Sequence, residues 1–238
     1  DEVNVTDRNG GAVTVTAEGG GKYTFTQPSG RVTITVTFRA ADSVSDCTGD
    51  ESCPMAPFTD VNMDGWYHDG VHYCIANGLM NGVSADEFDP NGTLTRAMMV
   101  TVLYRMEGEP AVSGAADFED VADGQWYTDA VAWAAANGIV NGISETEYAP
   151  NSNITREQLA TMLYRYADYK GYSTSAAGDL EDYSDAADVS DYAEEALTWA
   201  VDAELVNGMG DNTMVPQGSA TRAQTAALLM RFLQNIAE

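Results

Sequence analysis

The chain has 238 residues, of which 37 are Asp or Glu and only 11 are Lys or Arg, so its formal net charge at pH 7 is −26. Nucleic acids and anionic membranes bind to basic surfaces, so this charge argues strongly against nucleic acid as a partner and disfavours anionic membranes. The hydrophobic content of 44% is typical of a globular protein. We interpret the acidity as a solvated surface suited to salty or extracellular conditions.

Residues 1–40 alternate apolar and polar side chains between Gly-rich turns. This pattern predicts a small antiparallel β segment. Because roughly 40 residues are few for an independent core, we expect either the end of a larger β module whose upstream part is missing or a small sheet docked on the next domain. Residues 41–57 are polar, contain Pro54 and Pro57, and are predicted to form a linker.

The chain begins at Asp1 without a Met or a signal peptide, as expected of a mature or excised fragment. Its apolar runs are all shorter than the roughly 20 residues of a membrane-spanning helix. Cys47 and Cys53 flank a short polar loop where a disulfide would fit an oxidising, extracellular setting. A metal site at these two residues is the weaker alternative, since no further Cys/His pair has zinc-type spacing. Cys74 lies in an apolar helical pattern and is expected to be a buried thiol.

From Phe58 onward the sequence is an internal triplication, with copies at residues 58–117, 118–179 and 180–238 that open with FTDV, FEDV and LEDY. Each copy has a short segment with apolar side chains at i, i+3 and i+4, then a polar loop with a Pro, then a second apolar-striped segment. One such unit cannot bury both stripes. The pattern therefore predicts a mainly α fold in which three tandem helix–loop–helix repeats close around a shared core. Further apolar surface for this core comes from Trp66, Trp126, Trp133 and Trp199.

In two copies the first helix closes on an Asn-Gly pair, ending at Gly78 and Gly138, where Gly accepts the left-handed conformation that ends many helices. The third copy has Glu204 at this place. We expect either a remodelled helix end or a residue that carries strain of about 1 kcal/mol.

A Thr stands at the predicted start of each second helix, where an N-cap residue belongs. The three are Thr95, Thr155 and Thr221. Three residues later, Gln158 and Gln224 complete a capping box in the second and third copies, whereas Met98 breaks it in the first.

An Arg follows each of these Thr residues. The three are Arg96, Arg156 and Arg222. The helix dipole disfavours a cation at this position by about 0.3–1 kcal/mol, so each Arg needs another reason. One is an ion pair with Asp60, Asp120 or Asp182 from the opening turns; the other is an anion site that combines the guanidinium with the free N–H groups of the helix start. The residues alone favour neither.

A second set of Arg residues comes nine positions later, near the predicted C-terminus of each second helix. The helix dipole favours cations there, and we ascribe no further role to them. The three are Arg105, Arg165 and Arg231.

The order aromatic-Tyr, G-[LI]-[MV]-N-G, F-x-P and [LI]-T-R, tripled over residues 58–238, resembles the S-layer homology domain family. Members of this family form a three-repeat spindle with pseudo-threefold symmetry. They anchor bacterial surface proteins non-covalently to secondary cell-wall polysaccharides, which often bear pyruvate ketals. The resemblance implies that the family's motif Arg contacts the anionic sugar in grooves between repeats and that an aromatic residue stacks on a sugar face. The implied ligand-binding residues are Arg96, Arg156, Arg222, Trp66, Trp126, Gly82, Gly142 and Gly208.

The sequence departs from the family pattern in two ways. The Glu of the family's Thr-Arg-Ala-Glu motif is replaced in all three copies, by Met98, Gln158 and Gln224. Tyr192 replaces Trp in the third copy, and this copy also carries extra residues before Tyr192. These departures put the groove that uses Tyr192 in doubt. A structural alternative for Trp66 and Trp126 is packing in the core or between repeats.

The resemblance implies a non-catalytic anchor that holds a larger protein on a Gram-positive-type cell wall, with wall polysaccharide as its partner and no cofactor. The alternative is a self-assembling protein whose repeats pack against neighbouring copies in a surface lattice. An anchor is expected to be monomeric. No Ser/His/Asp set or phosphate loop occurs, and His68 and His72 are confined to one repeat, so we expect no enzyme. The EF-hand-like opening at Asp60 has Val71 where a bidentate Glu belongs, and we expect no metal site.

Overall fold

The computed structural model describes residues 2–7, 12–19, 22–26, 32–37 and 53–237. The chain divides into two compact units, residues 1–47 and 48–238, and each is described by itself. Within the described ranges, no helix has both the length and the apolar character needed to cross a membrane. Cys53 is buried, but Cys47 lies outside the described residues, so their disulfide stays a prediction.

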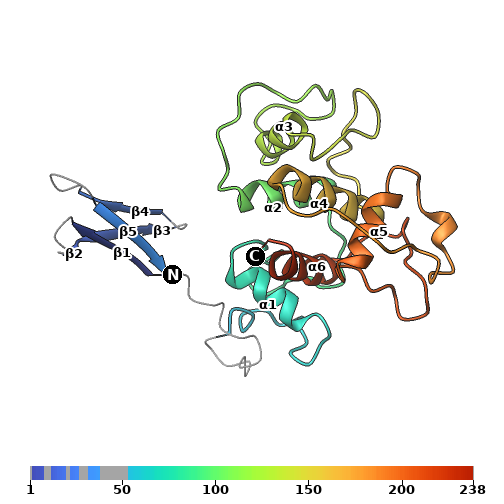
Figure 1. Ribbon diagram of the computed structural model, residues 1–238, viewed down its shortest axis with the longest axis horizontal. Helices are drawn as coiled ribbons and strands as arrows, with labels where there is room; N and C mark the ends of the chain where they lie inside the picture. The colour runs from blue at the N-terminus through green and yellow to red at the C-terminus, as the bar shows by residue number, and fades with distance from the viewer. Residues whose placement is uncertain (1, 8–11, 20–21, 27–31, 38–52, 238) are drawn as a thin grey trace. The chain divides into compact units, whose positions relative to one another are not determined.

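The N-terminal unit contains two small antiparallel sheets (Figure 1). The strands are β1 (Glu2–Asp7), β2 (Ala12–Val13), β3 (Val15–Gly19), β4 (Lys22–Phe25) and β5 (Val32–Thr37). In the first sheet β1 lies between β2 and β5, and Val5 is paired with Val13 on one side and Ile34 on the other. The second sheet pairs β3 with β4. Val5, on the central strand, is buried, and the predicted small antiparallel β segment is confirmed.

The second unit contains the three repeats, and each repeat contributes two α-helices. They are α1 (His68–Ala76), α2 (Arg96–Met106), α3 (Thr128–Ala136), α4 (Arg156–Lys170), α5 (Glu194–Asp202) and α6 (Arg222–Asn235), with a 3₁₀ turn η2 (Ala186–Asp188) before α5. The apolar stripes seen in the sequence are the buried faces of these helices. The predicted mainly α fold of three tandem helix–loop–helix repeats is confirmed.

The helices pack between repeats. The first helix of each repeat lies against the second helix of the preceding one, α3 on α2 and α5 on α4, and α1 closes the ring on α6 (Figure 1). Gly70 permits this closure, because a Cβ there would lie 2.6 Å from the backbone N of Ala227 in α6. Cys74 in α1 donates to Ala226 O at 3.5 Å. Its thiol is buried as predicted, and burial raises the pKa of Cys74 to about 12.

Three backbone hydrogen bonds form a closed ring about the pseudo-threefold axis. The amide of Leu94 donates to Ala220 O at 3.2 Å, that of Ile154 to Leu94 O at 2.9 Å, and that of Ala220 to Ile154 O at 2.9 Å. All three residues are buried, and each immediately precedes the Thr that caps a second helix. Each repeat supplies one donor and one acceptor, so the spindle closes without leaving a buried backbone group of this ring unpaired.

A strained loop precedes each second helix. Its central residue, which stands directly before a Pro, has a left-handed φ in every repeat: 57° at Asp89, 59° at Ala149 and 49° at Val215. An Asp side chain from the start of the same repeat holds the loop. The Asp120 carboxylate accepts from the amides of Tyr148 at 2.8 Å and Ala149 at 2.7 Å. Asp60 and Asp185 bind the equivalent amides in the other repeats.

In the third repeat the residue in this role is Asp185, so the alignment that put Asp182 there is wrong. Tyr183 packs against Gly208 as Phe58 packs against Gly82. The third repeat therefore opens with the aromatic residue Tyr183, three positions later than the LEDY motif suggests.

The end of the first helix also differs in the third repeat. Gly78 and Gly138 have φ of 66° and 70°, as expected for a left-handed helix end, and Glu204 has φ of 57° at the equivalent place. The helix end is therefore not remodelled. Glu204 is a strained residue, the second of the two predicted alternatives.

Candidate functional site

The start of each second helix is fully hydrogen-bonded within the protein. The Thr95 side chain accepts from the Met98 amide, and Thr155 and Thr221 form the two predicted capping boxes. The amides of Arg96 and Ala97 donate to carbonyl oxygens of the following repeat at 3.0 Å each, and α4 and α6 repeat this arrangement. The helix starts therefore offer no free N–H groups to a ligand, and that part of the anion-site interpretation is wrong.

The Arg side chains reach the strained loop of the following repeat. Arg96 Nε donates to Tyr148 O at 2.8 Å, and its Nη2 donates to Asn141 O at 2.9 Å. Arg222 binds the first repeat in the same way, through Phe88 O at 2.7 Å and Asn81 O. Arg156 Nε donates to Met214 O at 2.6 Å.

Two of these guanidinium groups also stack on an aromatic ring of the loop. Arg96 lies 4.6 Å from the ring centroid of Tyr148, and Arg222 lies 4.5 Å from that of Phe88. Together with the carbonyl hydrogen bonds, these contacts join each repeat to the next.

No carboxylate in the described part of the chain lies within ion-pair distance of Arg96, Arg156 or Arg222. The predicted ion pairs with the opening-turn Asp residues are therefore wrong. Asp120 acts on Arg96 only at longer range, and its charge partly offsets the effect of burial, which lowers the pKa of Arg96. Arg96, which is 5% exposed, uses two of its five N–H groups for carbonyl oxygens, and the described part of the structure shows no hydrogen bond from the other three.

Two hollows lie at these Arg residues, and each is built from all three repeats. The first, here called the Arg96 groove, has a volume of about 430 Å³, and the second, the Arg156 groove, has a volume of about 310 Å³. The Arg96 groove is lined by Arg96, Asn141, Gly142, Ile143, Gln158, Arg165 and Tyr192, among others. The Arg156 groove is lined by their symmetry equivalents Arg156, Asn207, Gly208, Met209, Gln224, Arg231 and Trp66.

The aromatic wall of each groove is open to solvent. Trp66 is 67% exposed and Tyr192 is 51% exposed, and Trp126 at the third equivalent position is 59% exposed. Rings exposed to this extent do not lie in a closed core, so the alternative that Trp66 and Trp126 pack in the core is wrong. The core contains the other two, Trp133 and Trp199, which are buried.

The glycines of the predicted site have a steric reason to be Gly. A Cβ at Gly82, Gly142 or Gly208 would lie within 3 Å of a backbone carbonyl oxygen of its own loop. In the described part of the chain, the amide N–H groups of these three glycines have no hydrogen-bond partner. Gly142 and Gly208 line the grooves, so each groove has a backbone donor next to its Arg residues.

The sequence did not identify the second cation of each groove. Arg165 and Arg231, which the helix dipole was sufficient to explain, both line a groove. With its amide turned so that Oδ1 faces the guanidinium, Asn141 accepts from Arg165 Nη1 at 3.3 Å. The two Arg residues of one groove come from different repeats, Arg96 with Arg165 and Arg156 with Arg231. The nine-residue spacing within one helix therefore does not reveal that they lie together.

The symmetry predicts a third set of groove residues: Arg222, Gly82, Met98, Arg105 and Trp126. This set offers fewer free polar and charged groups to a ligand than the other two sets. Arg105 Nε lies 3.8 Å from Glu109 Oε1, so its charge is partly neutralised. Met98 stands where Gln158 and Gln224 supply an amide to the other grooves.

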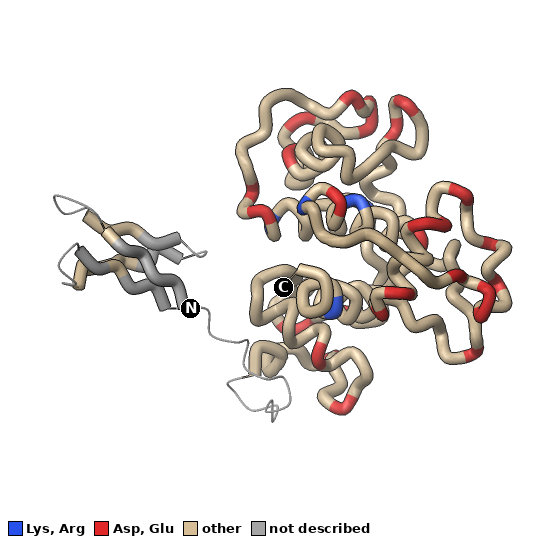
Figure 2. The backbone as a smooth tube through the Cα atoms, viewed as in Figure 1, with Lys and Arg blue, Asp and Glu red and all other residues tan. Residues whose placement is uncertain are grey.

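The surrounding charge is strongly acidic. Figure 2 shows Asp and Glu along the loops of this unit, while Lys and Arg lie near its middle. Every Lys and Arg from Phe58 onward lies in α2, α4 or α6. Long-range attraction of an anion is therefore weak, and binding would depend on contacts inside a groove.

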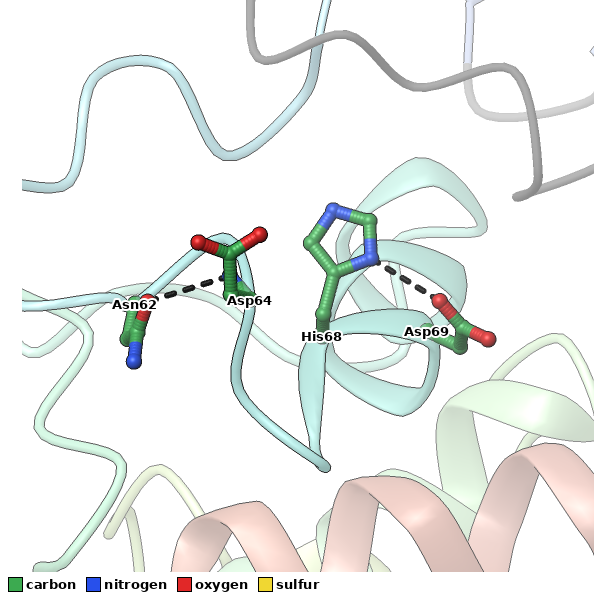
Figure 3. A network of polar contacts seen from close by, with 4 residues as sticks. All are labelled: Asn62, Asp64, His68 and Asp69. Atoms are coloured by element: carbon green, nitrogen blue, oxygen red, sulfur yellow. Dashed lines mark hydrogen bonds and ion pairs between the residues drawn. The ribbon is translucent and has the colours of Figure 1, made fainter.

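The first repeat contains the polar segment that resembles a calcium loop, and it is occupied by internal contacts. The Asp64 amide donates to Asn62 Oδ1 at 3.0 Å, and His68 Nδ1 lies 2.8 Å from Asp69 Oδ1 (Figure 3). Both carboxylate oxygens of Asp60 accept backbone amides. No group of three or more metal-ligating side chains that could hold a metal ion occurs within the described ranges.

Comparisons with known proteins agree with this architecture. The S-layer homology domain matches residues 57–98, 117–160 and 182–226, one match for each repeat. An endoglucanase of Bacillus sp. strain KSM-635 is 31% identical over 80% of this chain, and the surface-layer 125 kDa protein of Lysinibacillus sphaericus is 29% identical over 84%. A cellulosome-anchoring protein of Acetivibrio thermocellus is 24% identical over 69%.

The chain spans 20%, 17% and 36% of the lengths of these three relatives, respectively. The shared part is thus a module found in proteins of different kinds. Its presence indicates an extracellular protein of the bacterial cell surface, associated with the cell wall. The chain belongs to the S-layer homology domain family, with three tandem repeats that form one spindle.

Proposed function

We propose that this chain is a non-catalytic anchor that binds anionic, pyruvylated secondary cell-wall polysaccharide of a Gram-positive-type bacterium and so holds a larger surface protein on the wall. The observation that carries the proposal is the composition of the Arg96 and Arg156 grooves. Each combines two Arg residues from successive repeats with an exposed aromatic ring from the remaining one.

The groove chemistry suits a carboxylate attached to a sugar. A carboxylate accepts two parallel hydrogen bonds from a guanidinium, and such charge-assisted bonds are roughly twice as strong as neutral ones. The unpaired amide of Gly142 or Gly208 adds a backbone donor. The flat face of Trp66 or Tyr192 offers an apolar surface to the C–H groups of a pyranose ring.

The side chains of the grooves support a non-catalytic role. Their ionisable side chains are Arg and Tyr, which do not exchange protons readily near neutral pH. The activity in the name of the endoglucanase relative is not transferred, because this chain spans only 20% of that protein.

One relative favours the alternative of a self-assembling lattice protein, since it is named as a surface-layer protein. The two functions separate in solution. A lattice protein forms oligomers without glycan, whereas an anchor stays monomeric and binds the glycan.

The proposal is tested by retention on purified cell walls. Arg96, Arg156 and Arg222 also join the repeats, so removing them risks unfolding. The better change is Arg165→Gln with Arg231→Gln, which removes one groove cation from each groove. A hydrogen bond to a charged group contributes about 1.5–3 kcal/mol, so affinity per groove is expected to fall about tenfold to hundredfold.

Lys170→Gln is the matched control. Lys170 has the same charge but binds Glu107 at 2.8 Å, outside both grooves. The Lys170→Gln variant is expected to be retained as well as the unchanged protein. The unchanged protein is expected to be retained on walls of its own strain but not on chemically depyruvylated walls. Equal retention of the double variant and of Lys170→Gln would contradict the proposal.

A further inference from the structure

The aromatic wall of the Arg96 groove is held differently from its two symmetry equivalents. Trp66 and Trp126 are each followed by a Tyr, and the two rings meet edge to face, with centroids 5.5 Å and 5.1 Å apart. In the third repeat Tyr192 is followed by Ala193. In the described part of the structure Tyr192 has no contact with another aromatic ring, so the support that fixes the other two is missing.

A buried carboxylate takes the place of that support. Glu157, the second residue of α4, is only 2% exposed. Its Oε1 accepts from the Tyr192 hydroxyl at 2.8 Å, from Ser190 Oγ at 3.0 Å and from Gln217 Nε2 at 3.0 Å. Its Oε2 accepts from the Ser190 amide at 3.1 Å. Four donors satisfy the charge, which makes its burial tolerable.

The substitutions correspond across the three repeats. The residues equivalent to Glu157 are Ala97 and Ala223, which by symmetry stand next to Trp126 and Trp66. Where the groove aromatic is a Trp followed by a Tyr, the residue at the position of Glu157 is Ala. Where it is a Tyr followed by Ala193, that residue is Glu. The chain contains two solutions to the same problem, a ring fixed by a second ring and a ring fixed through its hydroxyl.

The hydroxyl is held close to the groove cations. Burial and the hydrogen bond to Glu157 raise the pKa of Tyr192 to about 12, so it donates to the carboxylate throughout the physiological range. Tyr192 also interacts electrostatically with both Arg96 and Arg165, and all three residues line the Arg96 groove.

We propose that Glu157 is a positioning residue for glycan binding, which fixes the Tyr192 ring as the wall of the Arg96 groove and so makes this groove equivalent to those built with Trp. The inference rests on the proposed function. A ring tied at its backbone and at its hydroxyl has little side-chain freedom left to lose when a sugar stacks on it. Releasing the hydroxyl is expected to weaken binding about threefold to tenfold.

The test uses a background in which only the Arg96 groove can bind, made with Trp66→Ala, Arg231→Gln and Trp126→Ala. The probe is the methyl glycoside of a 4,6-pyruvylated hexosamine, titrated by calorimetry. Glu157→Ala and Tyr192→Phe are each expected to weaken binding about threefold to tenfold, and the double variant is expected to be no weaker than either. Both leave the groove cations in place.

A rescue separates positioning from a merely structural role. Glu157→Ala combined with Tyr192→Trp and Ala193→Tyr installs the arrangement of the first two repeats. It is expected to restore the affinity to within about twofold, although the bonds of Glu157 to Ser190 and Gln217 remain lost. Gln217→Ala removes a partner of Glu157 without touching Tyr192 and is expected to leave the affinity unchanged.

Three-bond couplings of Tyr192 measured by NMR give a readout without ligand. They are expected to show one χ1 rotamer in the unchanged protein and averaging in Glu157→Ala. Unchanged affinity and a single rotamer in Glu157→Ala would overturn the inference. If Arg165→Gln in the same background also left binding unchanged, the proposed function of this groove would fail instead.

Discussion

Two of the Arg residues that follow a capping Thr, Arg96 and Arg156, both join two repeats and line a groove. Arg96 ties the strained loop of the next repeat through two carbonyl oxygens, and it also lines a groove with free N–H groups left over. The Asp of the loop binds the amides of the same segment from the other side. The unfavourable position of a cation at the helix start therefore has a structural reason, the hydrogen bonds to the next repeat. The proposed ligand contact uses the N–H groups that these hydrogen bonds do not use.

Glu204 tests the cost of a left-handed residue directly. Glu204→Gly is expected to raise the free energy of unfolding by about 1 kcal/mol, because Gly adopts a φ of 57° without a Cβ penalty. For a domain of this size the melting temperature is expected to rise by about 2–4 °C. Glu204→Ala keeps the Cβ and is the control; if it stabilised the protein as much as Gly does, backbone strain would not be the cause.

Asp185 gives a pH-dependent prediction. Although burial raises its pKa, hydrogen bonds from the amides of Met214 and Val215 and the charge of Arg156 lower the pKa of Asp185 below its ordinary 3.8 overall. Because the pKa is lower in the folded state, the carboxylate stabilises the fold above pH 3.8, and this contribution is lost as the pH falls through the folded-state pKa.

Asp185→Asn is therefore expected to lower the free energy of unfolding by about 1 kcal/mol at neutral pH, less than a buried charged hydrogen bond because water screens the site. The loss is expected to shrink as the pH falls below 3.8. Urea unfolding at a series of pH values measures it. Asp182→Asn, at an exposed neighbouring carboxylate, is the matched control and is expected to leave the free energy of unfolding at neutral pH unchanged.

At the scale of helices, each repeat packs mainly against its neighbouring repeats. The first helix of one repeat covers the second helix of the preceding one, so the structural pairs are α2 with α3, α4 with α5 and α6 with α1. The last pair joins the two ends of the repeat region. Because every repeat depends on its neighbours for a partner, the unit is expected to unfold as a whole.

The contact between α1 and α6 makes a prediction opposite to helix propensity. Gly70→Ala would gain about 1 kcal/mol in an isolated helix. Here the added Cβ would lie 2.6 Å from the Ala227 backbone, and overpacking of this kind costs about 1–3 kcal/mol. We expect net destabilisation in urea unfolding. A more stable Gly70→Ala would show that α1 does not approach α6 this closely.

Much of this element-level structure could be predicted from the sequence. Helix starts were predicted correctly because Thr155 and Gln158 make a local capping box that needs no tertiary partner. The apolar stripes predicted which faces are buried, but periodicity does not say which repeat covers them. The opening of the third repeat was misplaced because Leu180 begins a segment that resembles the FEDV motif, while Tyr183 has the packing role.

The grooves were harder to predict than the helices. Each one gathers residues from three repeats, and the sequence gives no distance between them. Arg165 was therefore assigned to the helix dipole alone, although it lines a groove with Arg96. Tyr192 was treated as a weakened Trp because its support by Glu157 crosses between repeats.

For the repeat unit as a whole, the three repeats share the same order and packing of helices but differ in the side chains at the groove positions. The Arg96 and Arg156 grooves share one plan with the Arg222 set that the symmetry predicts, but the Arg222 set has Met98 and a paired Arg105. Affinity for glycan is therefore expected to differ among the three. Calorimetric titration of the glycan into variants that each keep only one set of groove residues measures this difference. The variant that keeps only the Arg222 set is expected to bind most weakly.

The central claim is that the grooves recognise the carboxylate of an anionic sugar. Calorimetric titration with one wall oligosaccharide, prepared with and without its pyruvate ketal, tests it most directly. We predict saturable binding of the pyruvylated form and a loss of about tenfold or more in affinity without the ketal, since the charged hydrogen bonds to the Arg residues disappear. Equal affinity for the two forms, or no binding of either, would contradict the account.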